Sequence, residues 1–375
     1  MELARSCGLD PVGSICPPVG YPVTAWRTLR QWISSREPIA GAYDLIHAWT
    51  AQSANLVSAA LPDHRRVGSL PIGPVSGITT QYLTILLDRS PMPLIASSTA
   101  VKDEYRSIGI DPELVNILPP AVNPESSPSD DREALRARWG VDDATVVVGL
   151  LSEPVSWADM RHAIDVVARV AVSGRKVRLL CHHTATRRRS AERFASNIDM
   201  LDLLIMEDRV AEPWRIVNGL DVAMLIGGPL NTMDLRGAGS PFAALIGGGR
   251  RLRPMPGVMP LLWAMSAGVP VIVEASSAVS DIVDDGQTGL LVGQHDVNAA
   301  ADRLCRIHDD PTIAGRLGMN ARGFVQKNFH VSSFCVRLKD FYQRLTAARA
   351  GALVGHGNDD VIEQRDPHSM KWQRI

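Results

Sequence analysis

Short apolar runs alternate along this chain with segments whose apolar residues recur at helical spacing. The runs at 93–98, 144–151 and 176–183 are rich in Val, Ile and Leu, which is typical of buried strands. Between 160 and 171 the apolar residues recur every three or four positions, which predicts a helix that ends at Gly174. Strands that alternate with helices in this way predict an α/β fold with parallel sheets.

The first part of the chain predicts one such unit. Tyr43–Thr50 is expected to be a strand end that runs into a loop, and 65–70 a further strand. A helix is predicted from Thr99, as a possible N-cap, to Gly109, as its stop. The run 115–124 is expected to be a strand that ends in prolines.

The second part predicts another unit of the same kind. Residues 212–228 favour a short helix, a turn and a strand. Pro260 and Gly268 bracket a short helix, because proline suits a first turn and glycine suits the position after the last. The expected organisation is an N-terminal domain over 1–124, a linker over 125–135, a C-terminal domain over 136–300, C-terminal helices over 301–348 and a polar tail over 349–375.

Composition narrows the function classes. Hydrophobic residues make up 45% and charged residues 21% of the chain, and the net charge is −1. These values fit a soluble globular protein and argue against a broad nucleic-acid surface. The five cysteines are scattered without metal-ligand spacing, so we expect reduced thiols and no metal site. No leader and no apolar run of about 20 residues is seen, which favours a cytoplasmic protein with at most peripheral membrane contact.

Several motifs appear together in a fixed order. AMSAGVPVIV, SDIVDDGQTGLLV and the helical stretch that starts DVNAAADRL lie within 256–330, and DLIHAWT and GLDVAMLIG precede them. Together they resemble the retaining group 1, or family 4, nucleotide-sugar glycosyltransferases of the GT-B fold. The resemblance spans roughly Tyr43 to Leu345, and DDGQTGLLV is its most specific part.

This resemblance implies two Rossmann-like domains that face each other across a cleft. The N-terminal domain would hold a glycan, lipid or small-molecule acceptor, and the C-terminal domain a nucleoside-diphosphate sugar. The last helix would cross back to the N-terminal domain. The transfer would be metal-independent, would need no cofactor, and would retain the anomeric configuration. The family's opening strand, Gly-rich loop and helix have no counterpart before Tyr43, so the first domain is expected to lack that opening or the chain to start late.

The donor motif departs from the family pattern. Met255 and Trp263 occupy the two acid positions of the Glu-x7-Glu motif, and neither side chain accepts a useful hydrogen bond from a sugar hydroxyl. No Lys or Arg lies between Gly149 and Met160, where the family has both. Pro260 also removes one backbone amide from the helix that would face the diphosphate.

Candidate donor contacts follow from the alignment. They are Gly149, Arg250, Arg251, Arg253, Gly257, Val258, Met259, Trp263 and Asp281. The three arginines are hypothesised to replace the missing cations, because guanidinium groups suit phosphate oxygens; the alternative is a solvated loop. Trp263 would stack on a base or sugar, or else pack in the core. Asp281 would replace a family glutamate, or else cap the next turn.

Catalytic residues are less clearly indicated. His47 lies at a strand end and would orient an acceptor or else be a structural histidine. Glu274 is the nearest spare carboxylate at a strand end. Two functions therefore stay open: a glycosyltransferase with a remodelled donor site, or a catalytically silent homologue that acts as a binding or partner subunit.

Overall fold

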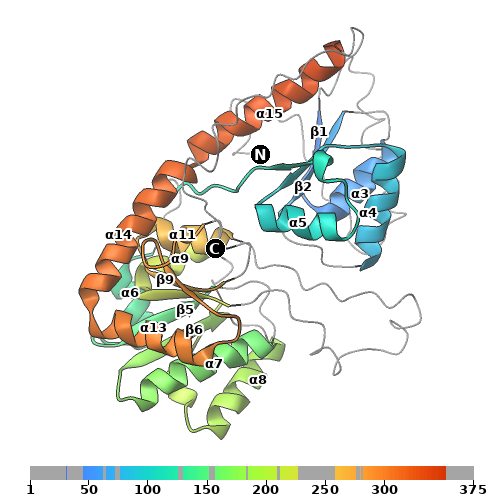
Figure 1. Ribbon diagram of the computed structural model, residues 1–375. Coiled ribbons are helices and arrows are strands. Elements are labelled where there is room, and N and C mark those ends of the chain that lie inside the picture. The colour runs from blue at the N-terminus through green and yellow to red at the C-terminus, as the bar shows by residue number, and fades with distance from the viewer. Residues whose placement is uncertain are drawn as a thin grey trace, which may run out of the picture.

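The computed structural model describes residues 31, 45–61, 65–71, 77–125, 130–151, 157–182, 185–208, 212–226, 258–275, 279 and 282–351. In these ranges the chain forms two α/β units, each built on its own sheet (Figure 1). The first sheet has four strands and the second has six, and all pairings are parallel. The α/β class expected from the alternating pattern is confirmed.

The N-terminal sheet follows the chain in the order β1-β2-β3-β4. Its elements are β1 (Ile46–Ala48), α3 (Ala51–Ala60), β2 (Arg66–Leu70), α4 (Gly77–Arg89), β3 (Leu94–Ala96), α5 (Thr99–Ser107), the 3-10 turn η1 (Pro112–Leu114) and β4 (Val115–Ile117). Thr50 caps α3 by accepting a hydrogen bond from the Ser53 amide at 3.1 Å. The cap of α5 was expected at Thr99 but is Ser98, whose hydroxyl accepts from the Val101 amide.

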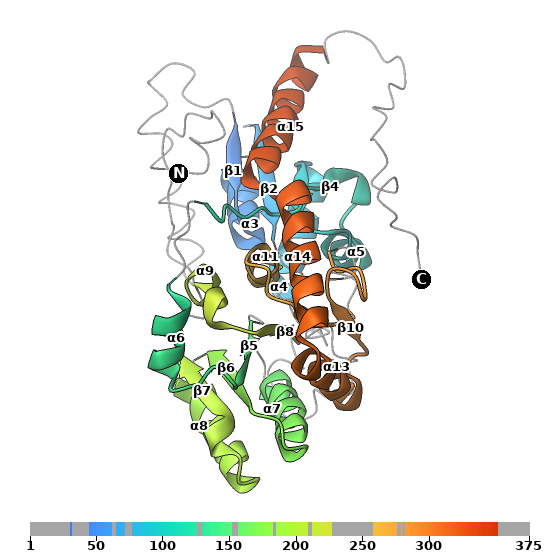
Figure 2. The same cartoon turned by 90° about the vertical axis from the view of Figure 1, so that its left-hand side faces the viewer.

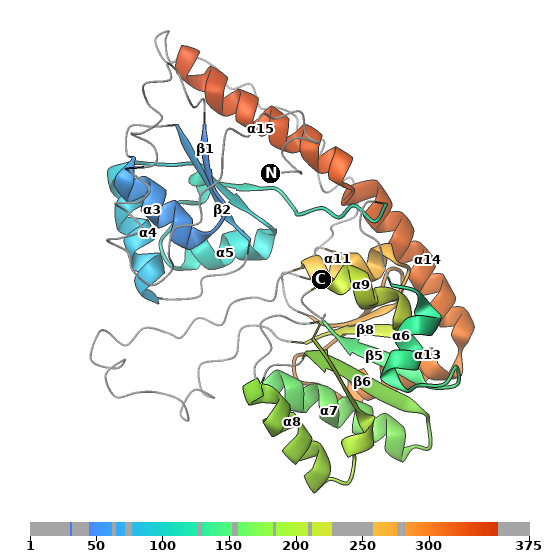
Figure 3. The ribbon, with the colours of Figure 1, turned by 180° about the vertical axis from the view of Figure 1, so that it is seen from behind.

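Alternate residues of these strands are buried on opposite faces of the sheet. Leu94 and Ala96 pack on the face that carries α3, α4 and α5. Val67 and Ile95 point the other way and meet α15 (Val331–Gly351), the last helix of the chain. Its Phe334, Leu338 and Phe341 complete that second core. Figures 1 and 3 show α15 lying along this side of the N-terminal unit, so a distant segment supplies its third layer.

The C-terminal sheet has the order β10-β9-β8-β5-β6-β7. Its elements are α6 (Arg132–Trp139), β5 (Val146–Leu150), α7 (Trp157–Val172), β6 (Val177–His182), α8 (Ala185–Asn197), η2 (Leu201–Leu203), β7 (Leu204–Glu207), α9 (Pro213–Ile216), η4 (Val217–Gly219), β8 (Val222–Leu225), α11 (Met259–Ser266), β9 (Val271–Glu274), β10 (Leu290–Val292), α13 (Val297–Asp309) and α14 (Pro311–Asn328). Because α6 begins at Arg132, the last residues of the expected linker are helical.

Helices cover both faces of this sheet. Val148 and Leu150 of β5 pack toward α7 and α13, whereas Val147 packs toward the face that carries α6, α11 and α14. The near-continuous apolar strands follow from this burial on both sides. A sheet with helices on both faces is the doubly wound arrangement expected for the C-terminal domain.

The two units are joined again where the chain passes from α14 to α15. Val122, after β4, forms a parallel bridge with His330. The Val122 amide donates to the Phe329 carbonyl at 2.9 Å, and the Val331 amide donates back to the Val122 carbonyl at 3.1 Å. Figure 2 shows α14 beside the C-terminal unit and α15 continuing beside the N-terminal strands.

Two further expectations concern the cellular setting. Cys335 is disulfide-bonded, which corrects the expectation that all thiols are reduced, whereas Cys181 and Cys305 are free. Among the described residues, none of the helices combines the length and hydropathy needed to cross a lipid bilayer.

Candidate functional site

The order of the C-terminal strands points to one edge of the sheet. After β5 the chain moves outward through β6 and β7, and from β8 it moves the other way through β9 and β10. Ligands of doubly wound folds bind beyond the carboxyl ends of the strands, where the strand order reverses. Here that place is beside Leu150 of β5 and Leu225 of β8, with Glu274 ending the next strand.

The first turn of α11 lies at this edge, because α11 connects two parallel strands, β8 and β9. Val258 is the N-cap residue, and its side chain makes no capping hydrogen bond to this helix start. Val258 is buried and Met259 is partly buried, so these two residues offer backbone amides rather than polar side chains. Such amides suit an anion, although Pro260 contributes none.

Trp263 belongs to the core. It is 8% exposed, and its ring centroid lies 5.7 Å from that of Trp214 on α9. The two tilted rings help to hold α9 and α11 together against the sheet. This position supports the packing interpretation of Trp263 that the sequence also allowed.

Gly149 lies inside β5, paired with Leu180 on one side and Ala223 on the other. A Cβ atom at this position would lie 2.5 Å from Cδ1 of Leu220. Glycine at this position therefore avoids a close contact with the Leu220 side chain.

Glu274 meets two histidines at the carboxyl end of β9. Its Oε1 lies 3.4 Å from Nε2 of His162 on α7 and accepts a hydrogen bond of 3.1 Å from the backbone amide of His295. The rings of His162 and His295 meet edge to face with centroids 5.7 Å apart. Burial lowers the pKa of His162, and the Glu274 carboxylate opposes this shift. His295 is exposed and precedes the N-cap of α13, Asp296.

His47 is the middle residue of β1 and lies on the face that α15 covers, whereas the sequence placed it at a strand end. Its Nε2 is 2.7 Å from the Ser69 hydroxyl, and its Nδ1 hydrogen-bonds the Tyr342 hydroxyl. The ring also stacks on Trp49 with centroids 4.0 Å apart. Burial lowers the pKa of His47 to about 3, so the ring is neutral at ordinary pH. With both ring nitrogens engaged, His47 has the contacts of a structural histidine.

Comparison with known proteins shows which proteins share this sequence pattern and fold. Residues 256–324 match the family described as "Glycosyl transferases group 1". No curated protein matches the sequence.

Solved structures are similar over most of the chain. HepE from Anabaena, in complex with UDP-glucose, has a TM-score of 0.69 at 16% identity, covering 87% of this chain and 84% of its own. Sucrose-phosphate synthase from Thermosynechococcus elongatus has a TM-score of 0.64 at 18% identity, covering 90% and 82%. A glycosyltransferase from Rickettsia africae has a TM-score of 0.62 at 13% identity, covering 92% and 87%. The chain has the GT-B fold.

Within this GT-B fold, the residues that match the family include α11, β9, β10 and α13 in full. They thus contain the helix start and the end of β9 described above. Several donor candidates, Arg250, Arg251, Arg253, Gly257 and Asp281, lie outside the described residues, as does Met255.

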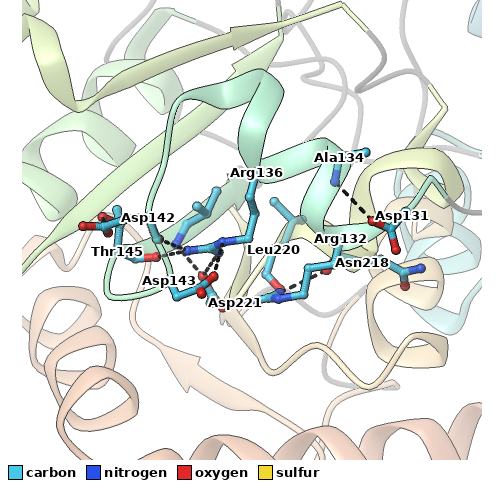
Figure 4. Close-up of polar contacts among 11 residues, drawn as sticks. Asp131, Arg132, Ala134, Arg136, Asp142, Asp143, Thr145, Asn218, Leu220 and Asp221 are labelled. Carbon is cyan, nitrogen blue, oxygen red and sulfur yellow. Dashed lines mark hydrogen bonds and ion pairs between the residues drawn. The ribbon is translucent and has the colours of Figure 1, made fainter.

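A charged network lies at the opposite edge of the same sheet of the GT-B fold (Figure 4). Asp221, just before β8, accepts from Arg132 at 2.6 Å, from Arg136 at 2.9 Å and from the Val147 amide at 2.8 Å. Arg136 also donates to the carbonyl of Thr145 at 2.7 Å. Because these contacts lie at the amino end of β5, they anchor α6 to the sheet and are not part of the candidate site.

Sequence reasoning placed Glu274 at a strand end but missed His162 and His295. His162 lies within an amphipathic helix, where a histidine carries no motif signal. His295 follows the DDGQTGLLV segment, in the loop that ends at Asp296. The one available signal was topological, since α7 follows β5 and α13 follows β10, which brings both helix starts to the carboxyl edge.

Proposed function

We propose that this protein binds a nucleoside-diphosphate sugar at the carboxyl edge of its C-terminal sheet and transfers the sugar to an acceptor held by the N-terminal unit. The observation that carries this proposal is the match of residues 256–324 to group 1 glycosyl transferases, since those residues build the helix start and strand end at that edge. A cytoplasmic location with at most peripheral membrane contact belongs to the same proposal.

The first turn of α11 supports the binding of a diphosphate. Its start has no side-chain cap and no acidic residue in the first turn, so neither a capping group nor a negative charge competes with an anion. Arg250, Arg251 and Arg253 precede this helix in the sequence and would add the cations that the segment after β5 lacks. The solved complex of HepE with UDP-glucose supports a uridine nucleotide sugar as the first donor to test.

The reaction proposed is a metal-independent transfer with retention. The bond between the anomeric carbon and the diphosphate oxygen breaks, and the diphosphate leaves with the electron pair. The acceptor oxygen bonds to the same face of the sugar and passes its proton to an oxygen of the departing diphosphate. The protein's part would be to stabilise the developing negative charge on the diphosphate through amide and guanidinium donors.

A panel of UDP-, GDP- and ADP-sugars tests this proposal by calorimetry and by mass spectrometry of the products. We expect binding of one nucleotide class, and either slow hydrolysis of the donor or transfer to a simple acceptor. The triple change of Arg250, Arg251 and Arg253 to Ala should weaken binding, and unchanged affinity would reject the role given to these arginines. No binding of any nucleotide sugar would reject the proposed function.

A second function is favoured by the place of Trp263. It stands where the family has an acid, and it is 8% exposed within the core. A chain that keeps the fold and lacks this carboxylate fits a catalytically silent subunit that binds a sugar nucleotide or a protein partner. Binding without turnover, across the whole donor panel, would favour this second function over the first.

A further inference from the structure

We propose that His162, Glu274 and His295 form a binding site for a divalent transition-metal ion of the zinc type. Each residue offers one ligand atom, and these atoms all lie within 4.8 Å of one another. Two imidazole nitrogens and one carboxylate oxygen are a common ligand set for zinc, which then keeps a fourth position open. The proposal goes beyond sugar transfer and does not depend on it.

The spacing of the two buried ligand atoms fits a shared ion. His162 Nε2 and Glu274 Oε1 are 3.4 Å apart, whereas a charge-assisted hydrogen bond between such groups would measure about 2.8 Å. Two ligands at about 2.1 Å from a tetrahedral zinc ion lie roughly 3.4 Å apart. The separation therefore fits two ligands of one cation.

His162 gives an independent indication of a missing partner. Its side chain is only 6% exposed, yet Nε2 has no hydrogen-bond partner among the described residues. A buried polar atom left in this way costs free energy unless something binds it.

The surroundings favour a cation. Glu274 is 1% exposed, and Asp159 and Asp165 on α7 add negative charge near His162. A buried carboxylate is stabilised when a metal ion binds to it. These carboxylates would attract a divalent ion to the site, although Asp165 also pairs with Arg161 at 3.8 Å.

His295 is held over this pair by its backbone. Its φ angle is 57°, a left-handed conformation that is uncommon outside glycine, and its amide donates to Glu274 Oε1 at 3.1 Å. Because the His295 side chain is exposed, its ring can turn toward the ion and leave the fourth position to water. The three ligands come from α7, the end of β9 and the loop before α13, so the ion would tie two helices to the sheet.

The test uses the full chain, treated with a chelator, dialysed, and titrated with zinc by calorimetry and with cobalt(II) by visible absorption. We expect one equivalent to bind, the intense visible bands of four-coordinate cobalt, and a higher melting temperature with zinc. His295→Asn removes one ligand and keeps a residue that tolerates the left-handed backbone. It should lower zinc affinity by roughly 100-fold. Removing a residue that only orients a metal ligand costs about 10- to 100-fold, and removing a ligand itself should cost at least as much.

Glu274→Gln keeps the shape of the side chain and should abolish the cobalt bands. His308→Asn changes a histidine of α13 outside the cluster and should leave zinc binding unchanged. Absence of zinc binding to the wild-type chain, or affinity that persists in His295→Asn, would overturn the proposal and leave a simple ion pair between His162 and Glu274. Since His295 is exposed, this variant should fold even if the buried substitution does not. Nucleotide-sugar binding, measured separately, can fail without affecting the zinc result.

Discussion

Tyr342 on α15 hydrogen-bonds through its hydroxyl to Nδ1 of His47, the middle residue of the first described strand. The other ring nitrogen of His47 lies 2.7 Å from the Ser69 hydroxyl. A neutral imidazole donates one hydrogen bond and accepts the other, and each hydroxyl can take the complementary role. The pair therefore joins the C-terminal helix to the N-terminal sheet through a ring that burial keeps neutral at ordinary pH.

Tyr342→Phe should loosen this attachment. The change removes one hydrogen bond from a partly buried histidine, so we expect the free energy of unfolding to fall by about 1 kcal/mol. Hydrogen exchange should rise in α15 and in β1, and not in the C-terminal sheet. Val336→Ala serves as the control, because Val336 lies on the same helix and is 61% exposed. Equal exchange in both variants would show that the contact does not hold α15 in place.

Glu104 on α5 should make the free energy of unfolding depend on pH. Burial raises its pKa from 4.5 to about 7, and its Oε2 is buried without a hydrogen-bond partner among the described residues. Between these values the folded carboxyl keeps its proton while the unfolded one loses it. Its contribution is therefore full below pH 4.5 and is lost as the pH rises through 7.

Glu104→Gln removes this penalty. We expect the variant to gain about 1 kcal/mol relative to wild type at pH 8 and little at pH 4, measured by urea unfolding. Glu113→Gln changes an exposed carboxylate of the same unit and should shift stability equally at both pH values. The lowered pKa of His47, about 3, has the opposite effect on the pH dependence of stability. Between pH 6.5 and 3 the unfolded chain protonates His47 while the folded chain does not, so the folded state loses stability as the pH falls through this range.

Gly318 allows α14 to approach α11. A Cβ atom at this position would lie 2.0 Å from the carbonyl oxygen of Gly268, which follows α11 with a φ of 79°. Gly318→Ala must therefore push the two helices apart, and we expect a loss of about 3 kcal/mol. In the same helix, Gly315 and Gly323 have open space at the Cβ position. Alanine at either should instead add about 0.5–1 kcal/mol through helix propensity, and thermal unfolding of the three variants makes the comparison.

Asp221 should contribute far more to the free energy of unfolding than an exposed carboxylate that also pairs with an arginine. It compensates the Arg136 guanidinium, whose side chain is 4% exposed, and accepts the Val147 amide. Asp221→Asn leaves that buried charge without its counter-ion, so we expect a loss of about 3 kcal/mol. Asp309→Asn breaks the more exposed pair with Arg175 and should cost at most about 1 kcal/mol. Similar losses of stability in both variants would show that the Asp221 network stabilises the fold no more than an exposed ion pair does.

Much of this fold follows from local patterns in the sequence. The apolar runs predicted β5 and β6, and Pro260 and Gly268 bracketed α11, whose ends are decided by residues nearby in the chain. The short strand β10 was not predicted, because its three residues follow a turn and depend on pairing with β9. Likewise Ser98 took the capping place expected of Thr99, since either hydroxyl fits the same pattern.

Less of the candidate site could be predicted from local sequence patterns. Glu274 could be placed from the end of a predicted strand, whereas its contacts with His162 and His295 depend on how α7 and the loop before α13 pack on the sheet. The burial of Trp263 against Trp214 has the same origin, because the two rings come from separate helices. Local periodicity carries no information about such pairs.

Pro260→Ala should strengthen nucleotide binding if the first turn of α11 holds a diphosphate. Proline has no amide hydrogen, so the change adds one donor at a helix start that has no side-chain cap. A hydrogen bond to a charged phosphate would raise the affinity for UDP by roughly tenfold, as measured by calorimetry. Met259→Leu keeps both the volume and the number of amides in the same turn and should leave the affinity unchanged. An equal affinity of Pro260→Ala and wild type for UDP would mean that the diphosphate, if bound, lies elsewhere along the strand ends.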